Sequence, residues 1–161
     1  MTTDDYEYLA QVWPNETVDA PSALWRRSSG APEYLSSIDW EWHAGTEEFA
    51  DRPADIFVPI TADEAEALQS DRQRFVRYWS YQHPHGVGKP EKENRVYRQR
   101  RSPEHVLEEV FGPDNAWVPT RLIREFIFGD PADRPEMIRI DQAAAEQLIQ
   151  QTRGVTGATE L

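Results

Sequence analysis

Two stretches of the chain share one pattern, in which a short apolar run is followed by a helical repeat of apolar positions. They are Asp55–Gln69 and Pro135–Gln150. In each stretch an isoleucine, Ile60 or Ile140, stands directly before a residue that commonly caps helices. The same residue types then recur at matching offsets: Ala65, Glu66, Leu68 and Ala145, Glu146, Leu148. Both stretches are therefore predicted to form a strand that runs into a capped helix.

The residues before the first helix have the period of strands. The run Tyr6–Trp13 alternates and is rich in aromatic residues, Ser22–Ser28 is a second apolar run, and a third strand is predicted from Tyr34 to Trp42. Alternation in the third run would place Ile38, Trp40 and Trp42 on one side of the strand. The helix itself is predicted to begin at a capping box of Thr61 and Glu64 and to end near Asp71.

The same order of features returns after Asp71. Arg74–Gln82 corresponds to Tyr6–Trp13, which pairs Trp79 with Trp13. The further correspondences are Val96-Tyr97-Arg98 with Leu24-Trp25-Arg26, Leu107 with Leu35, and Trp117 with Trp42. Their common order indicates a tandem duplication with a period near 75 residues. We interpret the recurring aromatic residues as packing anchors.

The predicted fold is α+β, with two tandem, pseudo-symmetric halves that each hold a small, mostly antiparallel sheet and a C-terminal helix. The boundaries are 1–71 for the first acidic repeat, 72–153 for a second repeat with longer loops and extra helices, and 154–161 for a flexible tail. A chain of 161 residues can bury a core of this kind without disulfides.

Two segments of the second repeat admit more than one interpretation. Ser102–Phe111 has the signature of a helix, with a capping serine, a following proline and Gly112 at its end, although the corresponding Glu33–Trp42 is predicted as a strand. Leu122–Phe128 is predicted to be a short helix whose apolar stripe either covers the sheet or faces a partner.

The charge of the chain lies almost wholly in its first half. Up to Gln69 three basic residues stand against fifteen acidic ones, which equals the net charge of −12 for the whole chain. From Ser70 onward fourteen basic residues balance fourteen acidic ones. Such a field repels nucleic acid and attracts basic proteins. A surface that is simply acidic and solvated is the alternative interpretation.

Cysteine is absent, so disulfides and thiolate metal sites are excluded. The acidic segment Met1–Tyr8 does not have the pattern of a secretion signal, and no apolar run has the length of a membrane span. We therefore expect a cytoplasmic protein. Arginine greatly outnumbers lysine, which occurs only at Lys89 and Lys92 and hints at a bacterial coding sequence of high GC content.

The leading hypothesis is a non-catalytic binding protein that meets a basic protein partner. An inhibitor or immunity protein for a basic toxin enzyme is one form of it, and a subunit of a larger assembly is another. The chain has no phosphate-binding glycine loop, nucleophile elbow or zinc-protease motif, and we expect no cofactor. The candidate partner-binding residues are Asp39, Trp40, Glu41, Glu47 and Glu48.

Two alternatives have candidate residues of their own. His83 and His85, two residues apart in a loop rich in proline and glycine, could bind one metal ion and support metal-dependent hydrolysis. Single-stranded nucleic acid could bind in the Arg72–Arg101 region, where aromatic residues stand among the arginines. The arginines of this alternative are Arg95, Arg98, Arg100 and Arg101. We favour instead that they face the acidic first repeat.

Overall fold

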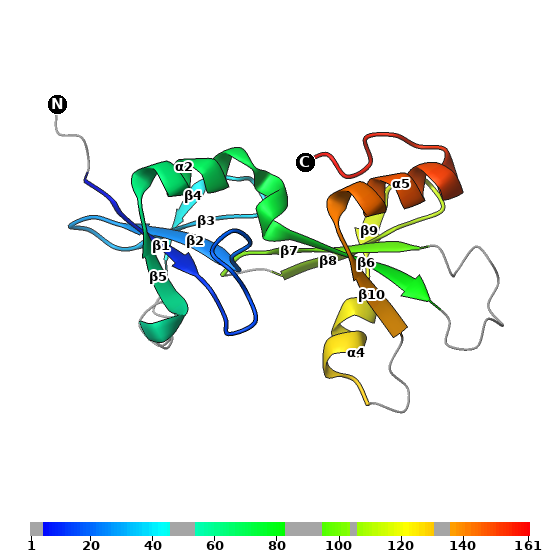
Figure 1. Ribbon diagram of the computed structural model, residues 1–161, viewed down its shortest axis with the longest axis horizontal. Helices are drawn as coiled ribbons and strands as arrows, with labels where there is room; N and C mark the ends of the chain where they lie inside the picture. The colour runs from blue at the N-terminus through cyan, green and yellow to red at the C-terminus, as the bar shows by residue number, and fades with distance from the viewer. Residues whose placement is uncertain (1–4, 46–53, 83–94, 104–105, 131–135) are drawn as a thin grey trace. The chain divides into compact units, whose positions relative to one another are not determined.

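The computed structural model describes residues 5–45, 54–82, 95–103, 106–130 and 136–161. The chain forms two compact units, one of Met1–Phe75 with Arg101–Val106, the other of Val76–Arg100 with Leu107–Leu161. Each unit contains a five-stranded antiparallel sheet that is followed along the chain by a helix (Figure 1). The predicted α+β fold of two similar halves is confirmed.

The first sheet has the strand order β4-β3-β2-β1-β5. Its strands are β1 (Glu7–Gln11), β2 (Ala23–Arg27), β3 (Glu33–Leu35), β4 (Trp42–Ala44) and β5 (Phe57–Ile60). The 3-10 turn η1 (Ala54–Ile56) precedes β5, and the helix α2 (Ala62–Ser70) and the 3-10 turn η2 (Arg72–Phe75) follow it. The predicted end of the helix near Asp71 is confirmed, since Asp71 is its C-cap.

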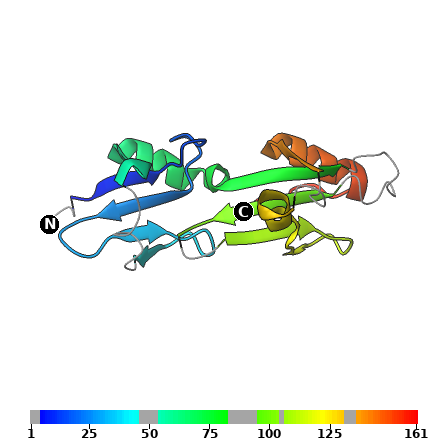
Figure 2. The ribbon, with the colours of Figure 1, turned by 90° about the horizontal axis from the view of Figure 1, so that it is seen from below.

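The second sheet repeats this topology in the order β10-β6-β7-β8-β9 (Figure 2). Its strands are β6 (Val76–Gln82), β7 (Val96–Arg101), β8 (Val106–Phe111), β9 (Trp117–Pro119) and β10 (Glu136–Ile140). The helices are α4 (Leu122–Phe128), between β9 and β10, and α5 (Gln142–Arg153), after β10. In both sheets the last strand pairs with the first, so the two units share one connectivity.

The strand register shows which residues of the two units are equivalent. Ile60 pairs with Tyr8 and Ile140 pairs with Tyr78, so the two isoleucines hold the same place. Leu9 pairs with Trp25, and Trp79 pairs with Tyr97. The predicted equivalence of Trp25 and Tyr97 is therefore confirmed. The predicted equivalence of Trp79 and Trp13 is wrong, because the register makes Trp79 the counterpart of Leu9.

The third predicted strand is in fact a hairpin. Leu35 of β3 pairs with Trp42 of β4, and Trp40 between them has a left-handed backbone with φ of 61°. A residue in that region ends the alternation of a strand. Trp40 and Trp42 nevertheless pack on the same cluster beneath α2, whereas Ile38 is exposed, so the predicted common side holds for the two tryptophans but is wrong for Ile38. In the second unit Phe111 pairs with Trp117. The equivalence of Trp42 and Trp117 is confirmed, and the counterpart of Leu35 is Phe111, not Leu107.

The helix predicted for Ser102–Phe111 is wrong, because residues Val106–Phe111 form the strand β8. Successive residues of β8 pack on opposite faces of its sheet: Phe111 lies in the cluster beneath α5, whereas Val110 packs on the cluster beneath α4. A helix would have placed its apolar residues on one stripe. Pairing with β7 and β9 and the burial of both faces override the capping signals.

Both long helices begin where the sequence predicts. The Thr61 hydroxyl accepts the Glu64 N–H at 3.1 Å, and the Glu64 carboxylate accepts the Thr61 N–H at 2.8 Å. In α5 the Asp141 carboxylate accepts the Ala144 N–H at 2.7 Å. The helix ends at Gly154, whose φ of 67° suits a residue without a Cβ atom.

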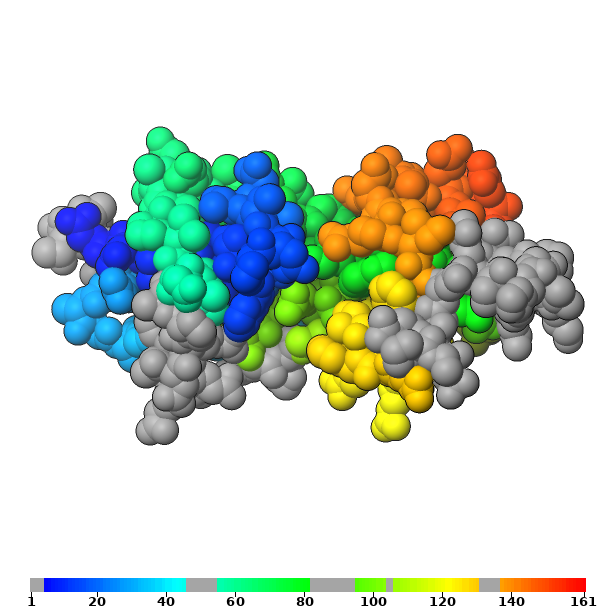
Figure 3. Space-filling view, turned by 60° about the horizontal axis from the view of Figure 1, so that its bottom comes forward, coloured from blue at the N-terminus to red at the C-terminus, as the bar shows by residue number. Residues whose placement is uncertain are grey.

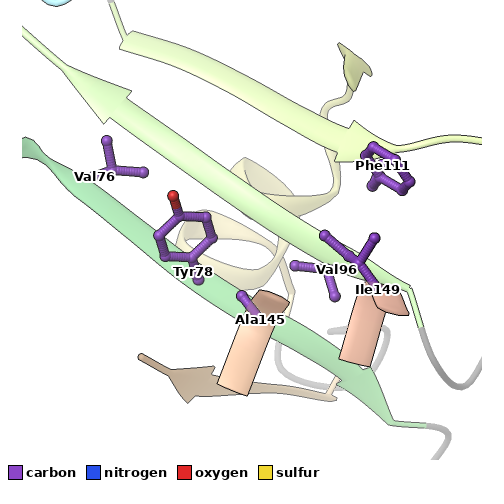
Figure 4. Packing of buried hydrophobic residues seen from close by; sticks show 6 residues of the cluster. All are labelled: Val76, Tyr78, Val96, Phe111, Ala145 and Ile149. Carbon is purple, nitrogen blue, oxygen red and sulfur yellow. The ribbon is translucent and has the colours of Figure 1, made fainter. Parts of the chain in front are cut away.

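Each sheet has an apolar cluster on both faces. Beneath α5 the cluster joins Ala145 and Ile149 of the helix to side chains of β6, β7 and β8 (Figure 4). On the other face α4 inserts Ile123 beside Trp79, Tyr97 and Met137. In the first unit the cluster beneath α2 contains Leu24, Leu35, Ala65, Leu68 and Phe75, and the opposite face contains Leu9, Ala23, Trp25 and Tyr34.

The stripe of α4 is divided between core and surface. Ile123 is fully buried, and Leu122 and Phe126 pack on the cluster around it. At the C-terminal end of the helix Ile127 is 41% exposed and Phe128 is 80% exposed. The helix lies at the surface of its unit (Figure 3). Its first turn covers the sheet, whereas its last turn faces solvent.

Candidate functional site

The tip of the β3–β4 hairpin contains three of the five residues that we predicted to meet a partner. Asp39 and Glu41 are exposed, and the Asp39 carboxylate accepts the Glu41 N–H at 3.0 Å. Its second oxygen lies 2.7 Å from His43 Nε2. The Glu41 N–H is the main reason that the pKa of Asp39 is lowered; desolvation opposes it, and the His43 hydrogen bond adds to the lowering. Asp39 is therefore held as a carboxylate at neutral pH.

Trp40 is half-buried beside these carboxylates. Its ring lies 6.0 Å from that of Phe75, measured between centroids, and the Arg72 guanidinium stands 5.4 Å above it. Ile38, at the same tip, is 49% exposed. The hairpin tip thus presents two carboxylates, an isoleucine and part of an indole to solvent, which is a surface suited to contact with a protein.

The other predicted candidates lie outside the described residues. These are Glu47 and Glu48 for the partner and His83 and His85 for the metal. Within the described ranges no three histidine or acidic side chains are grouped so that they could hold a metal ion. The metal-dependent hydrolase therefore stays a prediction that rests on the sequence alone.

Helix α2 carries exposed carboxylates that its counterpart lacks. Counting from the capping residue of each helix, the acidic residues Asp63 and Glu64 correspond to Ala143 and Ala144, whereas Glu66 has a counterpart in Glu146. All three carboxylates of α2 are exposed. Sequence reasoning treated Glu64 only as part of the helix cap. A comparison of the two copies of the helix is the signal that identifies the acidic face.

One arginine cluster occurs in both units. In the first, the Arg26 guanidinium lies 4.2 Å from the ring centroids of both Tyr6 and Trp42. Its Nε donates to the Glu33 carboxylate at 2.7 Å. Stacking and ion pairing together hold the planar guanidinium against the sheet.

The second unit repeats the cluster at equivalent positions. Arg98 lies 4.1 Å from the ring centroid of Trp117, and its Nε donates to Glu109 at 2.6 Å. Glu109 also accepts from Arg100 Nη2 at 3.1 Å. Burial lowers the pKa of Arg98, against the opposing effect of Glu109. The stacked ion pair of Arg98 has an equivalent in Arg26 and Glu33, which indicates a structural role for Arg98, whereas Arg100 stands at the position of Ser28 and shares only the Glu109 carboxylate.

The two remaining arginines of the nucleic-acid alternative also have contacts within the chain. Arg101 Nη1 donates to the Glu16 carboxylate at 2.9 Å, and both residues belong to the first compact unit. Arg95 is half-buried and stands beside the Tyr97 hydroxyl, whose pKa is raised mainly by burial and is partly restored by Arg95. Taken with the ion pairs of Arg98 and Arg100, these contacts leave fewer donors for phosphate groups.

The segment 154–161, predicted to be a flexible tail, packs on the second unit. Val155, Ala158 and Leu161 lie against the cluster beneath α5, and Thr159 is 2% exposed. The Trp117 indole N–H donates to the Ala158 carbonyl at 2.8 Å. We call residues 154–161 the C-terminal segment.

Glu146 of α5 binds the backbone of the C-terminal segment. Its carboxylate accepts the N–H groups of Gly157 and Thr159, the latter at 3.1 Å. Burial is the largest single influence and favours the neutral acid, but the backbone N–H groups of 157–159 and the Thr159 side chain together outweigh it. The pKa of Glu146 is therefore lowered, and its charged form holds the segment in place.

No described helix has the length and apolar character needed to cross a membrane. Comparison with protein-family models, with curated proteins and with solved structures finds no significant match for this chain, so its own residues must carry any inference about its function.

Proposed function

We propose that this chain is a non-catalytic binding protein whose acidic first unit meets a basic protein. The observation that carries the proposal is the set of exposed carboxylates in that unit. Over the described part of residues 5–72, the exposed basic side chains are Arg27 and Arg72. The exposed acidic ones are Asp5, Glu7, Asp19, Asp39, Glu41, Asp55, Asp63, Glu64, Glu66 and Asp71.

The distribution of these carboxylates supports a surface that acts through charge. Arg27 is already paired with Glu7 at 2.6 Å, so it offsets little of the remaining field. Asp63 and Glu64 of α2 correspond to alanines in α5, although both helices have the same place in their units. A negative field of this kind accelerates association with basic proteins and repels nucleic acid.

The hairpin tip adds contacts that charge alone does not supply. Ile38 and the accessible part of Trp40 can be buried against a partner, while Asp39 and Glu41 can pair with its basic side chains. An inhibitor or immunity protein for a basic enzyme is one protein of this type, and a subunit of a larger assembly is another.

Affinity capture from a lysate tests this proposal. Immobilised protein should retain basic proteins at about 50 mM salt and release them at about 500 mM, because salt screens charges that are exposed. The triple variant Asp5→Asn, Glu41→Gln, Asp63→Asn should lose most of this retention. Its matched control removes three exposed carboxylates from the second unit, with Asp114→Asn, Glu125→Gln and Glu160→Gln, and should retain the same proteins.

Two results would contradict the proposal. One is the absence of any retained basic protein at low salt. The other is equal loss of retention in the two triple variants, which would show that only the net charge matters and not the first unit.

A further inference from the structure

The second unit shows how this fold binds an extended backbone segment. Three side chains make hydrogen bonds to main-chain atoms of the C-terminal segment, and a fourth, Gln142, donates to the Thr159 hydroxyl at 3.4 Å. Of the three, Glu146 accepts two backbone N–H groups, and Trp117 donates to the Ala158 carbonyl. Tyr78 donates its hydroxyl to the Thr159 carbonyl at 3.5 Å. Most of these bonds go to main-chain atoms, so they recognise an extended chain more than a particular sequence.

The first unit has the same three residue types at the equivalent positions. Tyr8 and Tyr78 pair with equivalent isoleucines, and Trp42 and Trp117 pair with the last residues of β3 and β8. Glu66 and Glu146 each stand five residues after the capping residue of their helix. We call Tyr8, Trp42 and Glu66 the tail-site triad.

Among the described residues of the first unit, no segment matches 156–161. After α2 the chain turns through η2, where Phe75 packs into the cluster beneath the helix, and it then continues as β6. In the second unit Val155 packs against the corresponding cluster, and the C-terminal segment continues beyond it across Trp117. Phe75 and Val155 therefore mark the same place in the two units. After Phe75 the chain continues as β6, whereas after Val155 it continues as the C-terminal segment, which its own unit binds.

The side chains of the tail-site triad make no hydrogen bond to any of the described residues. Tyr8 and Trp42 are half-buried and Glu66 is exposed, whereas Tyr78 is 2% exposed beneath the C-terminal segment. Arg26 stacks on the Trp42 ring, and neither the Trp42 indole nitrogen nor the Tyr8 hydroxyl is among the buried side-chain atoms that lack a partner. The donors and the acceptor that hold a backbone segment in the second unit are thus accessible in the first.

Resting on the proposed function, we infer that the tail-site triad binds an extended segment of the partner protein. The segment has small residues at its centre and basic residues at its ends. Small residues are needed because Gly157 and Ala158 lie where the second unit makes its closest backbone contacts. Basic ends complement Asp63 and Glu64, which stand on α2 beside Glu66 and have no acidic counterparts on α5.

A peptide titration followed by NMR tests this inference. The probe is an acetylated and amidated peptide with the sequence of residues 153–161 and the substitution Glu160→Lys, which is basic at both ends. It is added to isotopically labelled protein, and the indole N–H signal of Trp42 is assigned from its loss in Trp42→Phe. A saturable shift of that signal is expected, and Glu66→Gln should weaken binding about tenfold, as expected for the loss of hydrogen bonds to a charged acceptor.

Two controls separate this site from its counterpart. Glu146→Gln weakens the hold on the C-terminal segment but leaves the tail-site triad intact, so the Trp42 shift should be unchanged. The unsubstituted peptide, which keeps Glu160, should bind at least threefold more weakly than the basic one. Equal binding of the two peptides would overturn the preference for basic ends.

Three other results would overturn the inference as a whole. They are no shift of the Trp42 signal at millimolar peptide, a shift confined to Trp117, or the same affinity in Glu66→Gln as in the natural protein. If salt-sensitive capture of basic proteins persists in any of these cases, the proposed function stands and the peptide site fails. If the peptide binds at Trp42 but no basic protein is captured, the site is supported and the broader proposal fails.

Discussion

The arginine cluster occurs in both units, so the same kind of ion pair can be tested at two degrees of burial. Glu109→Gln and Glu33→Gln each replace a carboxylate by an amide of the same size at equivalent positions. Each substitution removes the charge that faces an arginine stacked on a tryptophan. The main difference between the two sites is how much water reaches the ion pair.

The expected losses follow from burial. The side chains of Arg98 and Glu109 are 8% and 14% exposed, whereas those of Arg26 and Glu33 are 20% and 30% exposed. Removing one partner of a buried pair costs about 3 kcal/mol, because the other charge stays buried without its counter-ion. Exposed pairs contribute roughly 0–1 kcal/mol. We expect losses in the free energy of unfolding of about 3 kcal/mol for Glu109→Gln and about 1 kcal/mol for Glu33→Gln.

Burial already destabilises the charge of Arg98, whose pKa is lowered. In the natural protein Glu109 opposes this effect and also accepts a hydrogen bond from Arg100. Glu109→Gln therefore removes the carboxylate from two guanidinium groups at once. Glu33 has one arginine partner in its ion pair, which is a second reason for the smaller expected loss.

The assay is a urea titration in which each unit is followed by its own NMR signals. Signals from each unit are needed because two compact units can unfold in separate steps, and one averaged midpoint would then have no simple meaning. With a denaturant slope of roughly 1.5 kcal/mol per molar urea, Glu109→Gln should lower the midpoint of the second unit by about 2 M. Glu33→Gln should lower that of the first unit by less than about 1 M.

The reasoning would be refuted if Glu33→Gln destabilised its unit as much as Glu109→Gln does. Equal losses would mean that stacking on tryptophan, and not the exclusion of water, sets the contribution of the pair. Losses well below 1 kcal/mol at both sites would mean that the arginines reach solvent when their partners are removed.

Three further predictions concern other parts of the chain. Glu146 has a lowered pKa, so it holds the C-terminal segment fully above the ordinary carboxyl range and loses this hold as the pH falls through the lowered pKa. Below about pH 4 the NMR signal of the Trp117 indole N–H, which bonds to the segment, should therefore shift. Glu146→Gln should show the same shift already at pH 7. Gly45→Ala should cost about 1–3 kcal/mol, because a Cβ atom would lie 2.8 Å from the Trp25 ring, whereas Gly30→Ala meets nothing within 4 Å and should be neutral in a thermal melt. In α4, Ile123→Ala should cost about 2–5 kcal/mol and Phe128→Ala less than about 0.5 kcal/mol, and equal effects on the melting temperature would contradict the division of its apolar stripe.

Local signals in the sequence were enough to predict the two strand–helix stretches. Thr61 and Asp141 are helix caps because their side chains accept N–H groups three residues away, and Gly154 ends α5 in a left-handed conformation. These interactions involve neighbours along the chain, so they can be recognised without knowledge of the fold. The order of the recurring features was likewise enough to predict two similar halves.

Aligning the two copies by residue type gave a wrong correspondence at positions that are set by the strand register. The two tryptophans at 13 and 79 resemble each other in the sequence, but cross-strand pairing places Trp79 opposite Tyr97, as Leu9 lies opposite Trp25. A strand can shift along its neighbour without any change in its own composition. Only the pairing of the whole sheet determines the correspondence.

What the sequence determined by itself is therefore the local structure and the repetition: capped helices, alternating strands, their order and the charge of the first half. The tertiary structure alone decided that Ser102–Phe111 contains a strand, that Trp40 lies in a turn, and that residues 154–161 pack against Trp117. The turn at Trp40 is held by its neighbours, with the Trp40 N–H donating to the Ser36 carbonyl at 3.0 Å, but the other two features depend on residues distant in the chain. Such contacts form only when the sheet assembles, because no single segment encodes its partner across the sheet.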